Sequence, residues 1–388
     1  MSRDTCGWII IVCAILVVGS AVNLQMPLYP LYAAEAGFGH TGRALIFAIY
    51  ILGLVPTLAF AGGASDVLGR RPVVLAALIA AGVATLAMIL SPHLYVLLAA
   101  RLFHGVAVAL GIGSATAWLT ERFGDPKRAA WWSSFATAMA FGGGGLITTI
   151  AAATGGEGLV PWSYYLGFFA IVLVAIGIFY VPAGAGGSSG RWLRLPAFPS
   201  GTKLFTLGNT MSWAVSGIIL AQGPAAFAAA GMSTGSGIEV FTLCGTGALV
   251  QLIPRMRPSN PTVGMLLGAC FSTLALGLFA AGVKWSSSTL LFAACAAAGA
   301  ASFGLMFLAG LTAVNAAAGD RRAAAVSGYL LWSYIGFGVP SLLMARLADS
   351  FGEAIVLTWG TGVAAVAFTA LLLVVRTYRP PATVTHVP

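Results

Sequence analysis

Long uncharged stretches, separated by short clusters of charge, form the pattern of this chain. A membrane-spanning helix needs about 18 apolar residues, and eleven of the twelve stretches without Asp, Glu, Lys or Arg are that long. The stretches are 5–34, 44–65, 72–100, 102–120, 129–156, 158–190, 204–238, 240–254, 258–283, 285–319, 323–345 and 354–375. The short one, 240–254, follows Glu239, which itself lies within an apolar run. Because the strict alternation of barrel strands is absent, the pattern predicts twelve transmembrane helices.

The composition agrees with a membrane protein. Of the 388 residues, 59% are hydrophobic and only 7% are charged, whereas about 25% of the residues of a soluble domain are charged. The first stretch is too long for the apolar region of a signal peptide and leads directly into a second span, so we interpret it as the first helix. The chain is therefore predicted to be an all-α, multi-pass membrane protein, which we place in a bacterial-type inner (plasma) membrane.

Lys and Arg predict the orientation. If both termini lie on one side of twelve spans, fifteen of the nineteen basic residues fall on that side and three on the other, while Arg101 lies within a span. The positive-inside rule then places both termini in the cytoplasm. The net charge of +9 is accounted for by this topology and by affinity for anionic lipid headgroups. It does not indicate a nucleic-acid partner.

A stretch rich in Gly, Ser and Pro, "PAGAGGSSGRWLRLPAFPSGTK" at 182–203, interrupts the helical pattern. We interpret residues 183–202 as a cytoplasmic linker between an N-terminal six-helix bundle, 1–182, and a C-terminal one, 203–388. Weak echoes relate the two halves, such as "QMP" at 25–27 and "QGP" at 222–224. Their common offset favours a duplicated six-helix unit with pseudo-symmetry.

The loop between the second and third predicted helices carries the most specific motif. The motif consists of five residues at defined spacing: Gly62, Asp66, Gly69, Arg70 and Arg71. This segment, 62–71, resembles the signature loop of the major facilitator superfamily, and we call it the signature loop. "RLFHGVAVALGIG" at 101–113 is similar to the fourth-helix motif of the proton-coupled drug exporters in that superfamily, with His104 where the motif usually has Gln. The resemblance covers nearly the whole chain and implies transport by alternating access.

The chemistry of the signature loop suggests a latch. Gly62 permits close helix packing, and Asp66, Arg70 and Glu121 can form ion pairs at the cytoplasmic end of the bundle. Together with the start of the eleventh helix after Arg321 and Arg322, they would hold the two halves together in one conformation and release them in the other. The alternative is a solvated turn whose arginines only follow the positive-inside rule. This alternative accounts for the arginines, but it does not account for Asp66 or the glycines.

Three titratable or charged residues are predicted to lie within the membrane and to serve proton coupling. Arg101 should face the protein interior, since facing lipid would cost several kcal/mol. There it would bind an anionic substrate group or tune the pKa of a nearby acid. The alternative is that its side chain extends to the lipid headgroups of the outer leaflet. His104 lies one turn further and would either titrate or serve packing. Glu239 is an acid within an apolar run and would exchange a proton, unless it lies shallow enough to be hydrated.

Uncharged polar and aromatic residues provide further candidates for a substrate site. Amides near Pro27 and Pro224 lie where proline is expected to bend a helix and open backbone groups. Aromatic residues can stack on a flat substrate, but interfacial belts and packing use the same residues. The substrate-binding candidates are Asn23, Gln25, Arg101, Asn209, Trp213, Gln222, Tyr329 and Trp332.

The inventory of residues favours a transporter without a cofactor. The sequence contains no set of nucleophile, base and acid, no metal-ligand spacing and no phosphate-binding glycine loop, so we expect no enzyme, metal or cofactor. Related exporters often have a proline in the fifth helix, where this chain has the glycines 142–145, and the first helix lacks a deep acid. These departures favour neutral or anionic compounds over cations.

The leading hypothesis is export of a small amphipathic or organic-anion compound, coupled to protons by antiport, by a monomer in the lipid bilayer. Uptake of a polar metabolite by proton symport is the alternative, and a transport-inactive sensor or scaffold is the remote one. The signature loop does not distinguish export from import.

Overall fold

The computed structural model describes residues 3–37, 40–155, 158–184, 196–232, 236–252, 260–318 and 322–377, and every regular element in these ranges is helical. Eleven helical segments of this described part are long and apolar enough to cross a membrane, and the shorter apolar helix Gly237–Leu252 accompanies them. The all-helical prediction is confirmed. The short stretch expected at 240–254 corresponds to this short helix, while the side on which the termini lie stays a prediction.

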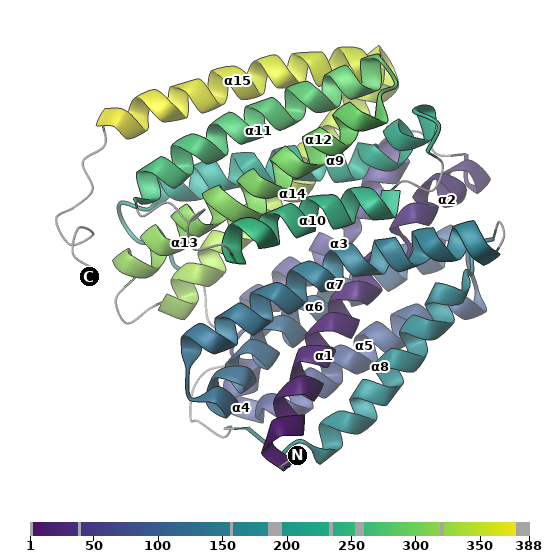
Figure 1. Ribbon diagram of the computed structural model, residues 1–388, viewed down its shortest axis with the longest axis vertical. Coiled ribbons are helices and arrows are strands. Elements are labelled where there is room, and N and C mark those ends of the chain that lie inside the picture. The colour runs from purple at the N-terminus through teal and green to yellow at the C-terminus, as the bar shows by residue number, and fades with distance from the viewer. Residues whose placement is uncertain are drawn as a thin grey trace. The chain divides into compact units, whose positions relative to one another are not determined.

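The helices before residue 185 comprise long ones, which lie side by side (Figure 1), and three short ones. They are α1 (Arg3–Asn23), the 3₁₀ helix η1 (Met26–Leu28), α2 (Tyr29–Glu35), α3 (His40–Ala61), α4 (Ala64–Leu68), α5 (Arg70–Leu90), α6 (Leu94–Phe123), α7 (Pro126–Gly155) and α8 (Trp162–Tyr180). Gly69, with φ of +95°, makes the sharp turn between α4 and α5, a conformation that glycine adopts without steric cost.

The helices after residue 195 repeat this alternation of long helices and short connections. They are α9 (Lys203–Ala229), α10 (Ser236–Leu252), α11 (Pro261–Lys284), α12 (Ser288–Gly299), the π-helix η3 (Ala300–Leu305), α13 (Met306–Ala317), α14 (Arg322–Phe351) and α15 (Glu353–Thr377). α12, η3 and α13 follow one another without a break and form a single span, Ser288–Ala317.

The chain divides into two compact units. Unit 1 contains Met1–Phe38, Ile49–Arg194 and Thr234–Phe241, and unit 2 contains Gly39–Ala48, Leu195–Ser233 and Thr242–Pro388. The first turns of α3 and α10 therefore each pack with the unit that does not contain the rest of their helix. The linker boundaries at 183–202 stay a prediction.

Helices approach each other closely inside each unit because glycine occupies the crossing points. In unit 1, a Cβ on Gly105 of α6 would lie 2.0 Å from the carbonyl oxygen of Tyr50 on α3. In unit 2, a Cβ on Gly217 of α9 would lie 1.9 Å from the carbonyl oxygen of Phe337 on α14. Such backbone contacts are a usual way for membrane helices to gain packing energy, since apolar surface is not driven out of lipid.

The first span is interrupted at one of the two prolines where we expected a bend. At Pro27 the first span changes from α1 through η1 into α2, because proline has no N–H for the helical ladder. At Pro224, α9 continues from Lys203 to Ala229, so the bend expected there stays a prediction. The π-helical turn η3 had no counterpart among the features predicted from the sequence.

Candidate functional site

A cationic cluster lies at the break of the first span in unit 1. We call it the Arg101 cluster; it comprises Gln25, Tyr29, Tyr50, Arg101 and His104. The Arg101 side chain, 1% exposed, donates from Nη1 to the carbonyl oxygen of Val22 at 2.5 Å. Its guanidinium carbon lies 4.7 Å from the ring centre of Tyr50 and 5.9 Å from that of Tyr29. The cation is therefore held in part by a backbone carbonyl and two aromatic faces.

The helix break explains why an arginine is stable here. Val22 lies in the last turn of α1, where carbonyl groups lack helical donors and the helix dipole favours a cation. Gln25 adds a second donor to the same oxygen, with Nε2 at 2.7 Å from the Val22 carbonyl oxygen. Arg101 thus caps the C-terminal end of α1, and the polar break is satisfied inside an apolar bundle.

His104 completes this cluster one turn further along α6. Its Nδ1 lies 3.5 Å from Nε2 of Gln25, and its Nε2 has no hydrogen-bond partner within the described residues although it is buried. The structure thus brings Gln25, Arg101 and His104 together. Asn23 belongs elsewhere, because its Nδ2 donates to the carbonyl oxygen of Phe141 on α7 at 2.8 Å.

The signature loop forms a network centred on Arg70. Arg70 donates from Nη1 to Asp66 at 2.5 Å and to Ser65 at 2.8 Å, and from Nε to Glu121 at 2.8 Å. Arg71 donates to the carbonyl oxygen of Val181 at the end of α8. The loop therefore ties α4, α5, α6 and α8 together at one end of unit 1.

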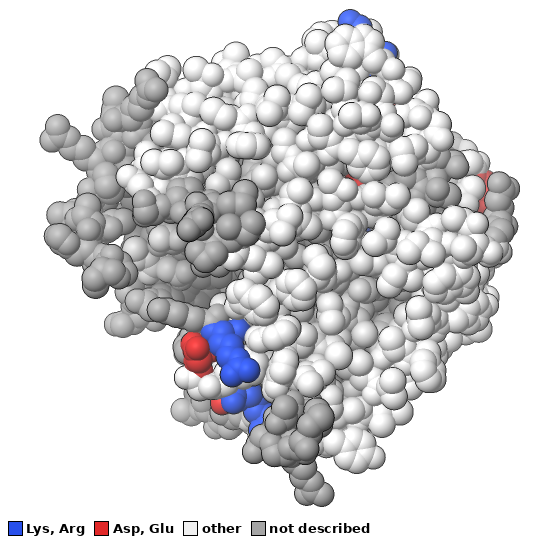
Figure 2. All heavy atoms as spheres, viewed as in Figure 1, with Lys and Arg blue, Asp and Glu red and all other residues white. Residues whose placement is uncertain are grey.

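A mixed patch of charged residues lies at the same end on the face shown in Figure 2. In Figure 2 the visible face is almost wholly uncharged, and its one mixed patch of acidic and basic atoms lies where Figure 1 labels α4. The latch was also expected to include the start of the eleventh helix after Arg321 and Arg322. That part cannot be compared, because residues 319–321 and the side chain of Arg322 lie outside the described residues.

Polar side chains of α9 in unit 2 are engaged by neighbouring helices. Asn209 Nδ2 donates to Ser333 Oγ of α14 at 2.7 Å, and the hydroxyls of Ser212 and Ser272 lie 2.7 Å apart. Gln222 is buried on the same helix. These contacts make Asn209 a residue that joins α9 to α14.

The aromatic candidates of unit 2 differ in their surroundings. Trp213 is buried and its ring lies 4.9 Å from Phe303 and 5.1 Å from Tyr334, measured between ring centres. Tyr329 is buried and donates to the carbonyl oxygen of Phe307 at 3.1 Å. Trp332 is 45% exposed on the surface of α14.

Trp213 also stabilises the π-helical turn η3. A π-helix disturbs the regular pairing of backbone groups, and such turns are frequent at functional sites. Trp213 Nε1 donates to the carbonyl oxygen of Ser302 at 2.8 Å, and Gln251 Nε2 donates to that of Phe303. The Ser216 and Ser302 hydroxyls, 2.6 Å apart, complete the contact of α9 with this turn.

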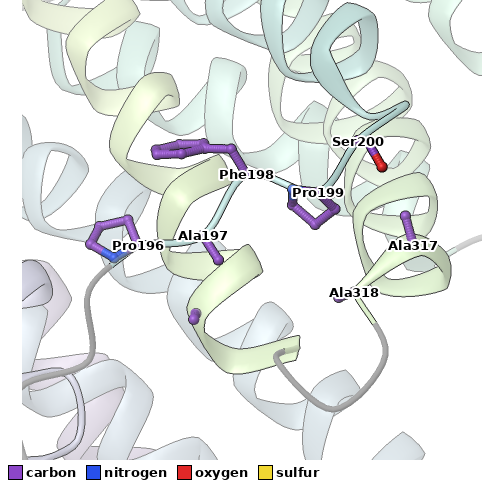
Figure 3. A pocket seen from close by; sticks show the side chains of 8 residues that line it. Pro196, Ala197, Phe198, Pro199, Ser200, Ala317 and Ala318 are labelled. Atoms are coloured by element: carbon purple, nitrogen blue, oxygen red, sulfur yellow. The ribbon is translucent and has the colours of Figure 1, made fainter.

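A cavity of about 430 Å³ lies beside the start of α14 in unit 2. Figure 3 shows the segment from Pro196 to Ser200 passing Ala317 and Ala318 at the end of α13. The Ala197 N–H donates to the Ala324 carbonyl oxygen at 2.8 Å and holds this segment on α14. The described lining residues carry no charge, so they lack a group that would recognise an ionic compound.

Glu239 lies in the first turn of α10, within the part of that helix that packs in unit 1. The side chain is 0% exposed, and neither carboxylate oxygen has a hydrogen-bond partner within the described residues. It is therefore buried more deeply than a hydrated position near the surface would be. Burial of an unpaired carboxylate in its charged form costs several kcal/mol.

Sequence reasoning missed the residues that act through backbone geometry. Tyr29 and Tyr50 hold Arg101, and no motif identified them. The same is true of Gln251 and Ser302 at the π-helical turn. Gly105 was a usable signal for Tyr50. A glycine one turn after Arg101 indicates that another helix backbone lies close to α6, and that backbone is the part of α3 that carries Tyr50.

In the described parts of the chain, no group of three or more His, Cys, Asp or Glu residues could hold a metal ion.

Comparison of sequences identifies the family. The model of the Major Facilitator Superfamily matches residues 11–339. The Tetracycline resistance protein, class G, of Vibrio anguillarum is 37% identical over 126 residues, which are 30% of this chain and 31% of the relative. Monosaccharide-sensing protein 2 of Arabidopsis thaliana is 30% identical over 157 residues, 39% of this chain and 20% of the relative. The matched segments thus span less than a third of either relative.

Solved structures show the same fold. The nucleoside transporter NupG (D323A mutant) superposes with a TM-score of 0.78 at 14% identity, covering 95% of this chain and 100% of that one. A bacterial homolog to the human lysosomal transporter Spinster, inward-facing and occupied, gives 0.70 at 13% identity, with 100% and 99% covered. The human organic anion transporter MFSD10 gives 0.58 at 14% identity, with 96% and 100% covered. At these identities the likeness concerns the fold alone.

These matches confirm the family indicated by the signature loop and by the motif at 101–113. They also confirm a multi-pass protein of plasma-membrane type, and they point to a transporter rather than an enzyme. The chain belongs to the Major Facilitator Superfamily and is a membrane transporter that works by alternating access.

Proposed function

We propose that this transporter exports a small amphipathic or organic-anion compound in exchange for protons. The observation that carries the proposal is the Arg101 cluster, in which a buried cation, an amide and an imidazole converge at a break in the first span. Broken helices with freed backbone groups are typical of substrate sites in secondary transporters. A buried guanidinium favours compounds with an anionic or strongly electron-rich group.

Two further features support this direction and chemistry. The partial relative from Vibrio anguillarum is a tetracycline resistance protein, and tetracycline is an amphipathic compound with several ionisable oxygens. Two buried titratable side chains, His104 and Glu239, provide sites at which protons can be bound during the cycle. The signature-loop network would hold one conformation of the cycle, as the Asp66, Arg70 and Glu121 contacts suggest.

The test measures proton movement in everted membrane vesicles that carry the protein. A respiratory substrate acidifies the interior, and a pH-sensitive acridine dye reports this acidification. Addition of tetracycline, or of a compound from a panel of amphipathic organic anions, should release protons from vesicles with the native protein. Vesicles with the Arg101→Ala variant, at the same membrane level, should show no release above that of empty vesicles.

Each outcome of this test has a distinct meaning. Proton release that occurs with one or more compounds and depends on Arg101 supports proton-coupled export. Vesicles preloaded with a polar metabolite that lose interior protons together with the metabolite, as it leaves down its gradient, would instead establish uptake by proton symport in the cell. Flux of neither kind across the panels would overturn the export proposal in favour of a sensor or scaffold.

A further inference from the structure

The first turn of α10 is joined to α7 by a contact that glycine alone permits, which we call the glycine crossing. A Cβ on Gly237 would lie 2.1 Å from the carbonyl oxygen of Gly145, and a Cβ on Gly142 would lie 2.9 Å from the Cα of Phe241. The Gly237 N–H also donates to Thr149 Oγ1 at 3.1 Å. This crossing explains the glycines at 142–145 in α7, which bring a second backbone into direct contact.

The same turn of α10 buries Glu239 on its other face. Successive residues of an α-helix are rotated by about 100°, so Glu239 points away from the line of Gly237 and Phe241 that meets α7. It shares a face with Leu243 and Thr246, one and two turns further along the helix. Both of its oxygens are buried and have no hydrogen-bond partner in the described part of the chain. A proton is the smallest ligand that removes the charge of such a group.

The charged and titratable residues of three helices, α7, α10 and α12, give no evident counter-charge for Glu239. The only charged residues of α7 are Lys127 and Arg128 in its first turn, about 30 Å from Thr149 at 1.5 Å per residue. The other titratable residue of α10 is Cys244. Leu243, on the face of Glu239, contacts Gly299 of α12, and the titratable residue of α12 is Cys295. A bound proton would neutralise Glu239 in these surroundings.

We propose that Glu239 is a proton-binding site that holds the first turn of α10 in the glycine crossing while it is protonated. Loss of the proton creates an unpaired buried charge, which is relieved when the turn leaves α7 and water reaches the carboxylate. The inference deepens the proposed function, because it assigns the coupling proton to the movement of one helix end. It differs from a role of Glu239 in contacting substrate.

Hydrogen–deuterium exchange of the purified full-length protein in nanodiscs tests this proposal without a substrate. The readout is the protection of the peptide covering 236–243, measured over a pH series and corrected for the pH dependence of intrinsic exchange. The native protein should lose protection in this peptide as pH rises. The Glu239→Gln variant, which is neutral at every pH, should keep it. Glu353→Gln, which removes an acid from the first turn of α15, should behave as the native protein does.

A second pair of variants tests the crossing itself. Gly237→Val should lose protection at every pH, because its side chain cannot fit against Gly145. Gly245→Val on the same helix meets nothing within 4 Å and should behave as the native protein does. Protection that does not change with pH in the native protein, or a pH dependence that survives in Glu239→Gln, would overturn the proposal. Since the readout involves no transport, its failure is distinguishable from failure of the export proposal.

Discussion

At the scale of single residues, the charge of Arg101 has a structural role in addition to the functional one that we propose. Its guanidinium lies at the carbonyl end of α1 and between two tyrosine rings. A lysine would keep the charge but would lose the planar group that stacks on the rings and the fixed geometry of several donors. The two properties can therefore be separated by substitution.

We predict that Arg101→Lys and Arg101→Ala both abolish coupled transport, but that only the alanine variant is strongly destabilised. Loss of the hydrogen bond from a charged donor to Val22 should cost on the order of 1–3 kcal/mol. Thermal unfolding in detergent measures stability, and the vesicle assay measures transport. Arg346→Ala is the control, because Arg346 is exposed. In the described part of the chain, its side chain has a hydrogen bond to Ser350, one turn further along the same helix. Transport retained in Arg101→Lys would show that charge alone suffices.

The second prediction concerns the two acids that share Arg70. Asp66→Asn and Glu121→Gln should each reduce transport about fivefold or more, the size of a typical coupling energy. Because Arg70 and its two partners are partly exposed, each change should cost no more than about 1 kcal/mol of stability. The double variant should be little worse than the more severe single variant, since both acids act through Arg70. Independent, multiplying losses of transport would contradict a shared network.

At the scale of helices, glycine decides which pairs of elements meet at their backbones. The α3–α6 crossing is the clearest case, because it lies within one turn of Arg101. Tyr50 supplies both the carbonyl that meets Gly105 and the ring that covers Arg101. Helix packing and the position of the cation therefore depend on one glycine.

We predict that Gly105→Ala destabilises the protein and displaces Tyr50 from Arg101. Its methyl group would lie 2.0 Å from the Tyr50 carbonyl oxygen, and overpacking of this kind typically costs about 1–3 kcal/mol. Gly113→Ala on the same helix meets nothing within 4 Å and should be neutral or stabilising by up to about 1 kcal/mol, since alanine favours helices. Unfolding temperature and the monodispersity of the detergent-solubilised protein compare the two variants. Equal stabilities would show that α6 can move away from α3 without cost.

The sequence predicted the helices well because hydrophobic length and the spacing of basic residues are local properties. Gln25, Arg101 and His104 were also recognisable, since polar side chains are conspicuous in apolar runs. The π-helical turn at 300–305 and the role of Tyr50 could not be predicted, because they depend on which backbone lies opposite. The residue type also does not tell how strongly a proline disturbs its helix, because α9 continues through Pro224 whereas the first span changes from α1 to η1 near Pro27.

At the scale of the molecule, two helices contribute to both units. The first residues of α3, up to Ala48, pack in unit 2 and the remainder in unit 1, while α10 is divided in the opposite sense. In unit 2, Asp349 Oδ2 of α14 accepts hydrogen bonds from the backbone N–H and Oγ1 of Thr41, at 3.1 and 2.5 Å. The carboxylate thereby caps the N-terminal end of α3, where the helix dipole favours an anion. Alternating access requires such shared helix ends to change their contacts.

The last prediction follows from this cap. Asp349→Asn weakens the cap and should free the start of α3 more often, so a cysteine introduced at Gly42 in a cysteine-free background should react several-fold faster with a membrane-impermeant thiol reagent. If the termini are cytoplasmic, the start of α3 is external and the reaction should occur on intact cells. Arg346→Ala, one turn away on α14, should leave the rate unchanged. An unchanged rate in Asp349→Asn would show that the cap does not restrain α3, and reaction only after cells are opened would reverse the predicted orientation.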